Sequence, residues 1–345
     1  MPDPVEESTP GRTASAGGKT GAGIPLSIVI PVYNEEAMLP ALFKELEEAR
    51  AAELRSHGPV EVVLVNDGSD DRSWDLIANH CRRHAGCVGV NLSRNFGHQL
   101  ALAAGLETAR GDVVVSMDAD LQDPPPVIAR MIESHRQGYD VVYATRRDRG
   151  DEPLLKRATA HFFYVLIEKL SGTPVPRNTG DFRLMSRRAL AELSRMRETH
   201  RFLRGLVPWI GFPQTQIFYD RAGRAAGTTH YPPRKMLGLA MDGIASMSAA
   251  PLRLAYGIAL LLFGLFVGDI VWAHWRHIFR GGALAPGWTS LMLAITCFGA
   301  MQLLLLGVFG EYLGRVYEQS KNRPLFIIQE IAQSGSEPPP NFPLK

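Results

Sequence analysis

Cysteine is scarce in this sequence, with only Cys81, Cys87 and Cys297 among 345 residues. A small secreted scaffold needs a dense, even set of cysteines, and a structural zinc site needs closely spaced Cys or His pairs. Neither pattern is present. The sequence therefore predicts no disulfide framework and no zinc site, and it favours a reducing compartment.

An excess of one charge is also missing, because 37 Lys and Arg face 35 Asp and Glu, a net charge of +2. This balance gives no reason to expect a nucleic-acid partner. No GxxxxGK[ST] loop and no GxGxxG turn occurs, which excludes the usual P-loop and dinucleotide-binding readings. Residues 1–24 lack an apolar signal core and are rich in Gly, Ser, Thr and Pro, so we expect a disordered tail.

Long apolar runs are confined to the C-terminal third, at 254–272 and 289–309. Each is close to the roughly 20 residues that a transmembrane helix needs. We expect a two-helix transmembrane hairpin over 251–312 and a cytoplasmic tail over 313–345. The alternative, two buried core helices, fits less well because both runs are so long and apolar.

Basic residues flank the two runs more densely than they occupy the loop between them. This bias favours cytoplasmic termini and a multi-pass protein of the inner (cytoplasmic) membrane, with its catalytic domain in the cytoplasm. Gly264 and Gly268 form a GxxxG spacing in the first run. Small residues let helices approach closely, within the hairpin or in a homo-oligomer.

The segment before the first run, 231–250, has apolar residues at helical spacing. Leu237, Met241, Ile244 and Met247 share one face, and Arg234 and Lys235 precede it. We expect an amphipathic helix at the membrane interface. An ordinary core helix remains the alternative.

Residues 25–230 alternate apolar, β-branched runs with helical segments. The expected strands are 26–32, 60–65, 87–93, 112–117 and 139–144, and the expected helices are 35–56, 71–84, 99–110 and 126–137. This alternation predicts an α/β domain with a Rossmann-like, mostly parallel sheet and helices on both faces.

Polar clusters follow four of these strands, at 33–36, 66–69, 93–95 and 118–120. Ligands in such sheets bind at the carboxyl ends of the strands. Asp118 and Asp120 are hard oxygen ligands at one strand end, so both could reach a Mg²⁺ or Mn²⁺ ion that also binds substrate phosphates. A helix N-cap pair before Pro124 is the alternative for this tripeptide.

The sequence contains four further motifs, IPVYNEE, VNDGSDD, DADLQDPP and NTGDFRLMSR. These motifs resemble those of the family 2 glycosyltransferases with the GT-A fold, and in particular those of the polyprenyl-phosphate glycosyltransferases. These include dolichol-phosphate mannose synthases and bacterial bactoprenol (undecaprenyl-phosphate) glucosyltransferases. The segment GEYLGRVYEQSKNRP at 310–324 resembles the bactoprenol glucosyltransferases most narrowly. The resemblance covers about 25–330.

The resemblance implies a role for each matching residue. The nucleotide pocket would be lined by Pro31, Tyr33 and Glu35, and Asp67 would contact the base or ribose. The metal and the donor diphosphate would be held by Asp118, Asp120 and Gln122. Asp181 would lie at the reacting centre with Asp120 and Arg183, and the acceptor phosphate would be received by Arg146 and Arg183. Tyr33 and Asp67 as purely structural residues, and Asp181 as an orienting partner of Arg183, are the alternatives.

The implied reaction moves a sugar from a nucleotide sugar to a polyprenyl phosphate with inversion. A phosphate monoester is mostly dianionic at neutral pH, because its second pKa is about 6. It is already a nucleophile, so a strong general base is not required. The enzyme must bring two anions together, a task that suits a metal ion and arginines.

Several alternatives stay open. The C-terminal segment favours UDP-glucose, but mannose from GDP-mannose or amino-arabinose from a UDP donor would use the same motifs. A processive polysaccharide synthase would carry a QxxRW motif and more membrane spans, and neither is found. An inactive membrane adaptor would be free to lose Asp118, Asp120 or Asp181, and all three are present.

Overall fold

The computed structural model describes residues 25–52, 54–55, 58–147, 179–199, 201–220, 250–280 and 287–336. The expected tail at 1–24 and the expected amphipathic helix at 234–248 lie outside the described residues. Both remain predictions.

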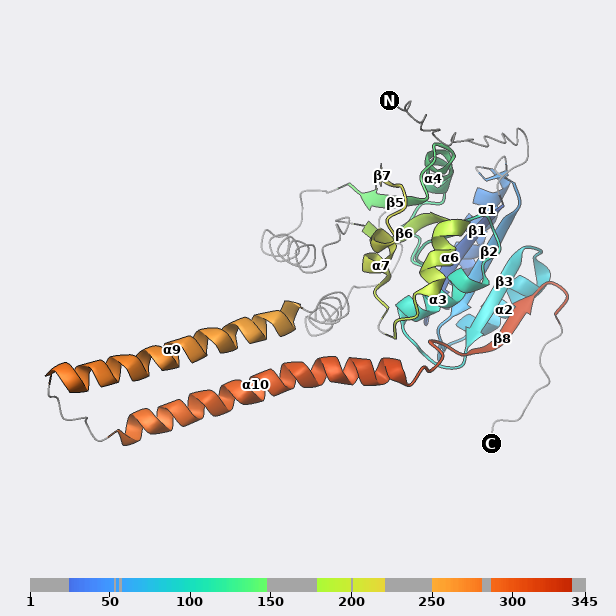
Figure 1. The fold of residues 1–345 in the computed structure, drawn as a ribbon. Helices are drawn as coiled ribbons and strands as arrows, with labels where there is room; N and C mark the ends of the chain where they lie inside the picture. The colour runs from blue at the N-terminus through green and yellow to red at the C-terminus, as the bar shows by residue number, and fades with distance from the viewer. Residues whose placement is uncertain are drawn as a thin grey trace, which may run out of the picture.

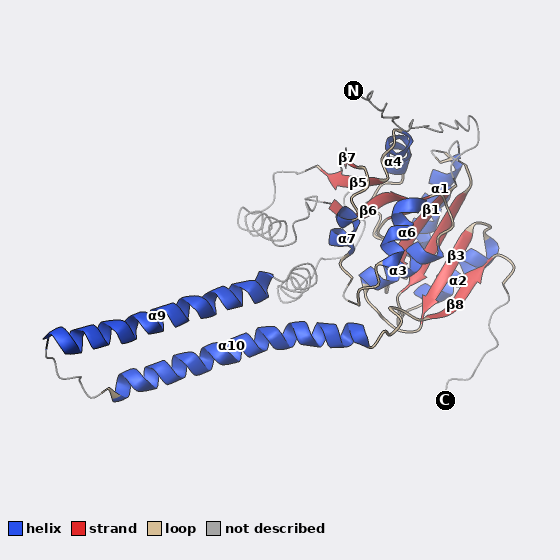
Figure 2. Cartoon of the chain, viewed as in Figure 1, coloured by secondary structure: helices blue, strands red, loops and turns tan. Residues whose placement is uncertain are grey.

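The described chain forms an eight-stranded sheet in the order β7-β5-β6-β4-β1-β2-β3-β8. Figure 2 shows the strands with helices packed around them. The strands are β1 Leu26–Val32, β2 Val60–Asn66, β3 Cys87–Leu92, β4 Val113–Ser116, β5 Val141–Arg146, β6 Thr179–Ser186, β7 Gln214–Tyr219 and β8 Ile328–Gln333. The helices of this domain are α1 Leu39–Ala51, α2 Ser73–Arg83, α3 His98–Thr108, α4 Pro126–Arg136, α6 Arg187–Arg195 and α7 Leu203–Trp209.

The central strands are parallel and apolar, as the sequence predicts. β1 lies between β2 and β4, and all seven of its residues are buried. Its side chains alternate between two cores: Ile28 and Ile30 face one, and Val29 faces the other. Because successive side chains of a strand point to opposite faces, this run of β-branched residues needs helices on both sides of the sheet.

The two cores divide the helices between the faces of the sheet. One core takes its helical residues from α1, α2 and α4, including Leu42, Ile77 and Met131. The other takes them from α3, α6 and α7, including Leu102 and Leu193. The four predicted helices between β1 and β5 are confirmed. α1 begins four residues and α2 two residues later than expected, α3 begins one residue earlier, and α4 begins at the predicted residue.

Three strands are not predicted by the sequence analysis, and two of them run antiparallel. β6 inserts between β4 and β5 and is antiparallel to both. β7 joins β5 in parallel, and β8 pairs antiparallel with β3. The mostly parallel sheet is confirmed, but β6 reverses one direction at the centre. That reversal matters for the site, because residues at the start of β6 lie level with the end of β4.

Two long helices, α9 Ala250–Arg280 and α10 Trp288–Ser320, extend side by side away from the sheet (Figure 1). Among the described residues, one helical segment, Cys297–Ser320, is long and apolar enough to cross a membrane by length and composition. It overlaps the second predicted span. The first predicted span stays a prediction, because the apolar stretch found in α9, Tyr256–Leu265, is shorter than a span.

After α10 the chain turns at Asn322, whose φ is 46°. It then returns to the sheet as β8. The predicted tail over 313–345 therefore includes the last turns of α10 and an edge strand of the sheet.

Cys81 in α2 and Cys87 in β3 form a disulfide, with their Cα atoms 4.7 Å apart. The sequence analysis did not foresee this pair. The cause is local: α2 ends at Arg83, and a short turn containing Gly86, at a φ of 81°, places the start of β3 directly under the helix end. Both cysteines are buried.

Candidate active site

The site lies where β2 and β4 end and β6 begins. Ser116, the last residue of β4, pairs with Arg183 of β6. Because β6 runs antiparallel to β4, this register places Asp181 beside the loop that follows β4. The chain thus brings together two motifs that are about 60 residues apart.

Asp181 is buried at the centre of a cluster of cationic and amide groups. Its carboxylate accepts hydrogen bonds from Arg183 Nη2 at 2.5 Å, Arg204 Nη2 at 3.1 Å and Gln99 Nε2 at 3.2 Å. His98 Nε2 lies 3.3 Å from Asp181 Oδ2. We name these five residues the Asp181 cluster.

The cluster keeps Asp181 ionised. Burial alone would raise the pKa of Asp181, but the hydrogen bond with His98 and the charges of Arg183 and Arg204 hold that pKa well below its usual range. Burial likewise opposes the charged form of His98, yet the Asp181 hydrogen bond and nearby Asp118 raise the pKa of His98. A carboxylate held by this many positive groups is a poor proton acceptor.

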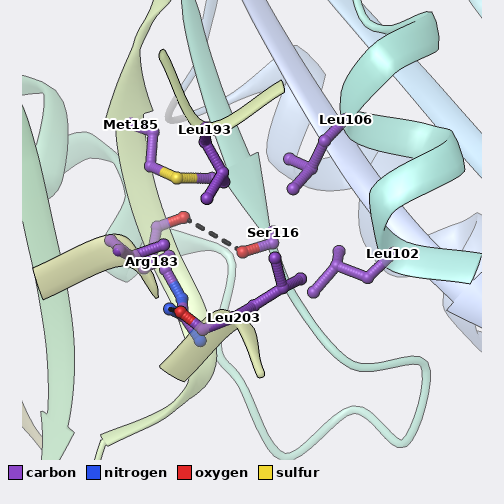
Figure 3. A pocket seen from close by; sticks show the side chains of 8 residues that line it. Leu102, Leu106, Ser116, Arg183, Met185, Leu193 and Leu203 are labelled. Atoms are coloured by element: carbon purple, nitrogen blue, oxygen red, sulfur yellow. Dashed lines mark hydrogen bonds between the residues drawn. The ribbon is translucent and has the colours of Figure 1, made fainter. Parts of the chain in front are cut away.

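Arg183 occupies a different place from the one expected for an acceptor-phosphate ligand. Its side chain is only 2% exposed, and its guanidinium donates to Leu203 O and Gly180 O, both at 3.3 Å, besides Asp181. Figure 3 shows it at a small pocket, with Ser116 Oγ bonded to the Arg183 carbonyl. The remaining lining is apolar and includes Leu102. The predicted contact between Arg183 and the acceptor phosphate does not fit this position, because the guanidinium is enclosed and already committed.

Arg204 is the residue of the Asp181 cluster that the sequence analysis missed most clearly. It sits on α7, and its side chain is 36% exposed while it contacts Asp181. The segment HRFLRGLVPWIGF does contain it, but no spacing in that segment points to Asp181. Only the pairing of β6 with β4 and the packing of α7 on that face bring the two together.

The loop after β4 carries the predicted metal ligands. Gln122 N donates to Asp120 Oδ1 at 3.2 Å, and Leu121 between them has a φ of 57°. A left-handed conformation is costly for a leucine, so the surrounding structure holds this turn in place. The turn keeps Asp118, Asp120 and Gln122 within one short loop.

Two oxygen atoms of this loop are suited to bind a cation. Asp118 Oδ1 and Gln122 Oε1 are buried and have no hydrogen-bond partner among the described residues. Burial, together with the carboxylates of Asp123, Asp181 and Asp120, raises the pKa of Asp118 to about 6, against the opposing charge of His98. Asp118 Oδ1 lies 3.6 Å from His98 Nε2. Buried oxygens that accept no hydrogen bond, beside a carboxyl group with a raised pKa, fit a divalent cation as a ligand.

In the part of the chain that the structure describes, no three His, Cys, Asp or Glu side chains form a metal cage. A Mg²⁺ or Mn²⁺ site does not need such a cage, because these ions keep waters and substrate phosphates and often use only one or two carboxylates. The oxygen set of Asp118, Asp120 and Gln122 therefore fits this class of ion.

Asp67 lies at the end of β2 and holds the loop that precedes α3. Its carboxylate accepts from Phe96 N at 2.7 Å and from Gly97 N at 2.9 Å, and the residue is 2% exposed. Burial raises the pKa of Asp67, and these two hydrogen bonds only partly offset it. Asp67 thus holds the loop just before His98. Its predicted contact with the base or ribose stays a prediction.

Gly68 allows the turn after β2 to pack closely against the loop that precedes α3. Its φ is +63°, and a Cβ there would lie 2.3 Å from the backbone carbon of Arg94. No side chain fits, so the turn after β2 packs directly on the loop that leads to His98.

The remaining predicted donor residues lie at the end of β1. Pro31 is buried within the strand, whereas Tyr33 is exposed. Glu35 N donates to Ser73 Oγ at 3.0 Å, which joins the β1 turn to α2. These residues border the same sheet edge as Asp67 and Asp118.

Arg146 belongs to a second hydrogen-bonded group of side chains, next to the loop that follows β4. Its Nε donates to the Tyr219 hydroxyl at 3.2 Å, and that hydroxyl donates to Asp123 Oδ1 at 2.7 Å. Asp123 Oδ2 in turn accepts from Asp118 N at 3.4 Å. Arg146 is partly exposed beside this group, so it remains placed to meet an anion near the loop. Asp123 lay within a quoted motif but was not assigned a role, and Tyr219 carried no signal in the sequence.

The fold and the site, with strand-end carboxylates, an oxygen-rich loop and several arginines, define an α/β protein suited to bind a divalent cation and an anionic ligand. The profile described as "Glycosyl transferase family 2" matches residues 27–194. The chain belongs to this family and is a glycosyltransferase.

Its curated relatives match over most of their length. An uncharacterised glycosyltransferase of Bacillus subtilis is 42% identical over 89% of this chain and 94% of its own. A prophage bactoprenol glucosyl transferase homolog of Escherichia coli is 39% identical over 89% of this chain and 99% of its own. The bactoprenol glucosyl transferase of Shigella phage SfV is also 39% identical, over 89% and 99%.

Solved structures resemble the chain more distantly. Mannosyl-3-phosphoglycerate synthase from Rubrobacter xylanophilus shares 18% identity at a TM-score of 0.45, covering 67% of this chain and 74% of that one. Likenesses at this level support no statement about ligands.

Proposed function

We propose that this glycosyltransferase moves glucose from UDP-glucose to a polyprenyl phosphate at the cytoplasmic face of the membrane, with inversion. The observation that carries the proposal is the Asp181 cluster. Its carboxylate is ionised but already bound by cations and an amide, so it is unsuited to take a proton. An acceptor that needs no deprotonation, such as a phosphate dianion, matches this site.

The relatives named bactoprenol glucosyl transferase support the lipid part of the proposal, because the chain matches nearly their whole length. Glucose and the lipid acceptor come from those names. UDP as the nucleotide comes from the resemblance of the C-terminal segment.

In the proposed reaction, an oxygen of the acceptor phosphate attacks the anomeric carbon. A carbon–oxygen bond forms there as the bond to the donor diphosphate breaks, and the nucleoside diphosphate leaves. No proton is transferred. A single in-line displacement inverts the anomeric centre.

Residues of this chain hold the two anions together. Arg204 and Arg146 are partly exposed beside the site and would receive the acceptor phosphate, whereas buried Arg183 orients Asp181. Pro31, Tyr33, Glu35 and Asp67 would shape the nucleotide pocket. Asp118, Asp120 and Gln122 would bind Mg²⁺ or Mn²⁺, which would supply Lewis-acid stabilisation of the leaving diphosphate.

We further propose that α9 and α10 both span the membrane, with both chain termini and the catalytic domain on the cytoplasmic side. Basic residues outside the hairpin and the long apolar α10 support this arrangement. The proposed hairpin would keep the catalytic domain at headgroup level, and the glycines of α9 leave room for a homo-oligomer.

The test uses purified full-length protein in lipid nanodiscs with polyprenyl phosphate and Mg²⁺ or Mn²⁺. UDP-glucose, GDP-mannose and a UDP-amino-arabinose derivative are compared, and release of nucleoside diphosphate and formation of glycolipid are measured. We expect glycolipid from UDP-glucose, with inverted anomeric configuration. Preferred turnover of another donor would refute the sugar, and no glycolipid from any donor would refute the acceptor.

A further inference from the structure

The last turn of α10 contacts the catalytic domain through Gln319. Its Oε1 accepts from Thr199 N at 2.8 Å and from Thr199 Oγ1 at 2.9 Å. Its Nε2 donates to Arg197 O at 2.8 Å. Both ends of the side-chain amide are used, so the contact specifies the position of residues 197–199 and does not merely touch them.

The contacted segment leads directly to the Asp181 cluster. Arg201, 7% exposed, donates to Leu193 O at 2.9 Å and to Met196 O at 2.6 Å, and it pairs with Glu107 at 3.5 Å. Leu203 N donates to Gln99 Oε1 at 3.2 Å. The next residue is Arg204, which reaches Asp181. A shift at 197–199 would therefore bear on Arg204, because the hydrogen bonds of Arg201 and Leu203 hold the residues just before it.

The chain that follows α10 contacts the loop that leads to His98, another cationic residue of the Asp181 cluster. Phe326 packs against the core that contains α3, and Ile327 O accepts from Ser93 N at 3.0 Å. Ser93 opens the loop that ends at His98. The last turn of α10 thus contacts the segment that leads to Arg204, and the chain that follows α10 contacts the loop that leads to His98.

We infer that Gln319 is a positioning residue that couples membrane helix α10 to Arg204 in the Asp181 cluster. The inference rests on the proposed function, in which the acceptor is a membrane lipid phosphate. Such a phosphate is held at headgroup depth, and α10 is held by the bilayer. Fixing residues 197–204 to the helix end fixes the height at which Arg204 meets the phosphate. Misplacement of a reacting group by about 1 Å can cost about a hundredfold in rate.

The test compares Gln319→Leu with Ser320→Ala in the full-length protein. Ser320 is the next residue and donates only within its own helix, to Tyr317 O at 2.8 Å, so it serves as the matched control. We expect Gln319→Leu to lower kcat/KM for polyprenyl phosphate in nanodiscs about tenfold, because it removes the three hydrogen bonds to Arg197 and Thr199 at an exposed position. The KM for the nucleotide sugar and the melting temperature should stay unchanged. Gln319→Glu keeps an acceptor for Thr199 and should recover part of the loss.

A double variant separates coupling from a general effect. If Gln319 acts through Arg204, Gln319→Leu should cost nothing further in an Arg204→Ala background, because residues that act as one unit are not additive. Additive losses would overturn the inference, as would Gln319→Leu behaving like Ser320→Ala. A rise in the nucleotide-sugar KM together with a fall in melting temperature would assign Gln319 a structural role only. Wild-type protein that makes no glycolipid would refute the proposed function, an outcome distinct from these.

Discussion

Asp181 is a single residue whose surroundings decide its chemistry. In a strand-end crevice an aspartate is an obvious base, but this one is bound by Arg183, Arg204 and Gln99 and faces His98. Its charge compensates the buried guanidinium of Arg183 and the partly exposed side chains of Arg204 and His98. This carboxylate therefore holds the two guanidiniums in place, which agrees with the proposed acceptor, a phosphate that is already anionic.

Asp118 gives the first prediction at this scale. Asp118→Asn keeps the size of the side chain and removes the charge that Mg²⁺ or Mn²⁺ would need. We expect kcat/KM to fall by about 10²-fold to 10³-fold, the cost of losing one preorganised electrostatic contact. Glucosyl transfer, measured with and without excess chelator, tests this, and Asp70→Asn on an exposed turn is the control. Full turnover by the wild type in excess chelator would contradict the metal role.

Asp140 gives a prediction about stability and pH. Its buried carboxylate accepts from Arg188 Nε at 2.5 Å and from Ser186 Oγ at 2.6 Å. These interactions, Arg188 first, lower the pKa of Asp140 despite burial. Asp140→Asn should reduce the free energy of unfolding by about 1–3 kcal/mol at neutral pH.

The sign of the pH dependence follows from that lowered pKa. The ionised carboxylate stabilises the fold above its unfolded-state pKa of about 4, and this contribution is lost as pH falls through the lower folded-state value. The difference between wild type and Asp140→Asn should therefore be constant above about pH 5 and shrink below about pH 4. Denaturant titrations at several pH values measure it, with exposed Asp112→Asn as the control. A difference that grows in acid would show that the assigned ion pair is wrong.

Gly105 allows helix α3 to lie close to the sheet. A Cβ on Gly105 would lie 2.3 Å from Val29 Cγ1 and 2.8 Å from Val65 Cγ2. The helix therefore packs closely over β1 and β2, which puts its first turn, with His98 and Gln99, beside Asp181. The approach of one element sets the position of two site residues.

Gly105→Ala tests this packing. In an open helix the change would stabilise by up to about 1 kcal/mol, but here overpacking should destabilise by about 1–3 kcal/mol. Gly257→Ala in α9, where a Cβ would meet nothing within 4 Å, is the matched control. Thermal denaturation in detergent measures both. A raised melting temperature for Gly105→Ala would mean that α3 can move away from the sheet.

At the scale of the whole molecule, the edge of the sheet is covered by β8, a strand that follows the two long helices α9 and α10. β8 covers the edge of β3, and Arg82 pairs with Glu330 at 2.9 Å across that edge. A chain that ends at residue 249 would therefore lose β8 as well as α9 and α10. It would expose β3 along its free edge, and an unpaired edge strand invites aggregation.

A truncation comparison tests this role of β8. We expect a chain of residues 25–249 to be aggregation-prone and to melt at a lower temperature than a chain in which a flexible Gly/Ser linker replaces 250–321 and β8 is kept. Light scattering and thermal denaturation distinguish the two. Equal solubility and equal melting temperatures would show that β8 is dispensable for the fold.

Hydrophobic periodicity in the sequence by itself determined β1 to β5 and the helices between them. Each strand such as 26–32 is a continuous β-branched run whose burial on both faces is a local property. The same parallel order determined that Asp67 and Asp118 share one edge of the sheet, because carboxyl ends of parallel strands meet there.

Only the tertiary structure decided what those residues contact. Strand patterns reveal that a segment is extended, but not which strand it pairs with or in which direction. The insertion of β6 antiparallel to β4 brought Asp181 to the site and enclosed Arg183. The packing of α7 placed Arg204 beside Asp181. β8 and the contact of Gln319 with Thr199 likewise join residues more than 100 positions apart. Such pairings depend on how the whole chain packs, so no local sequence pattern could predict them.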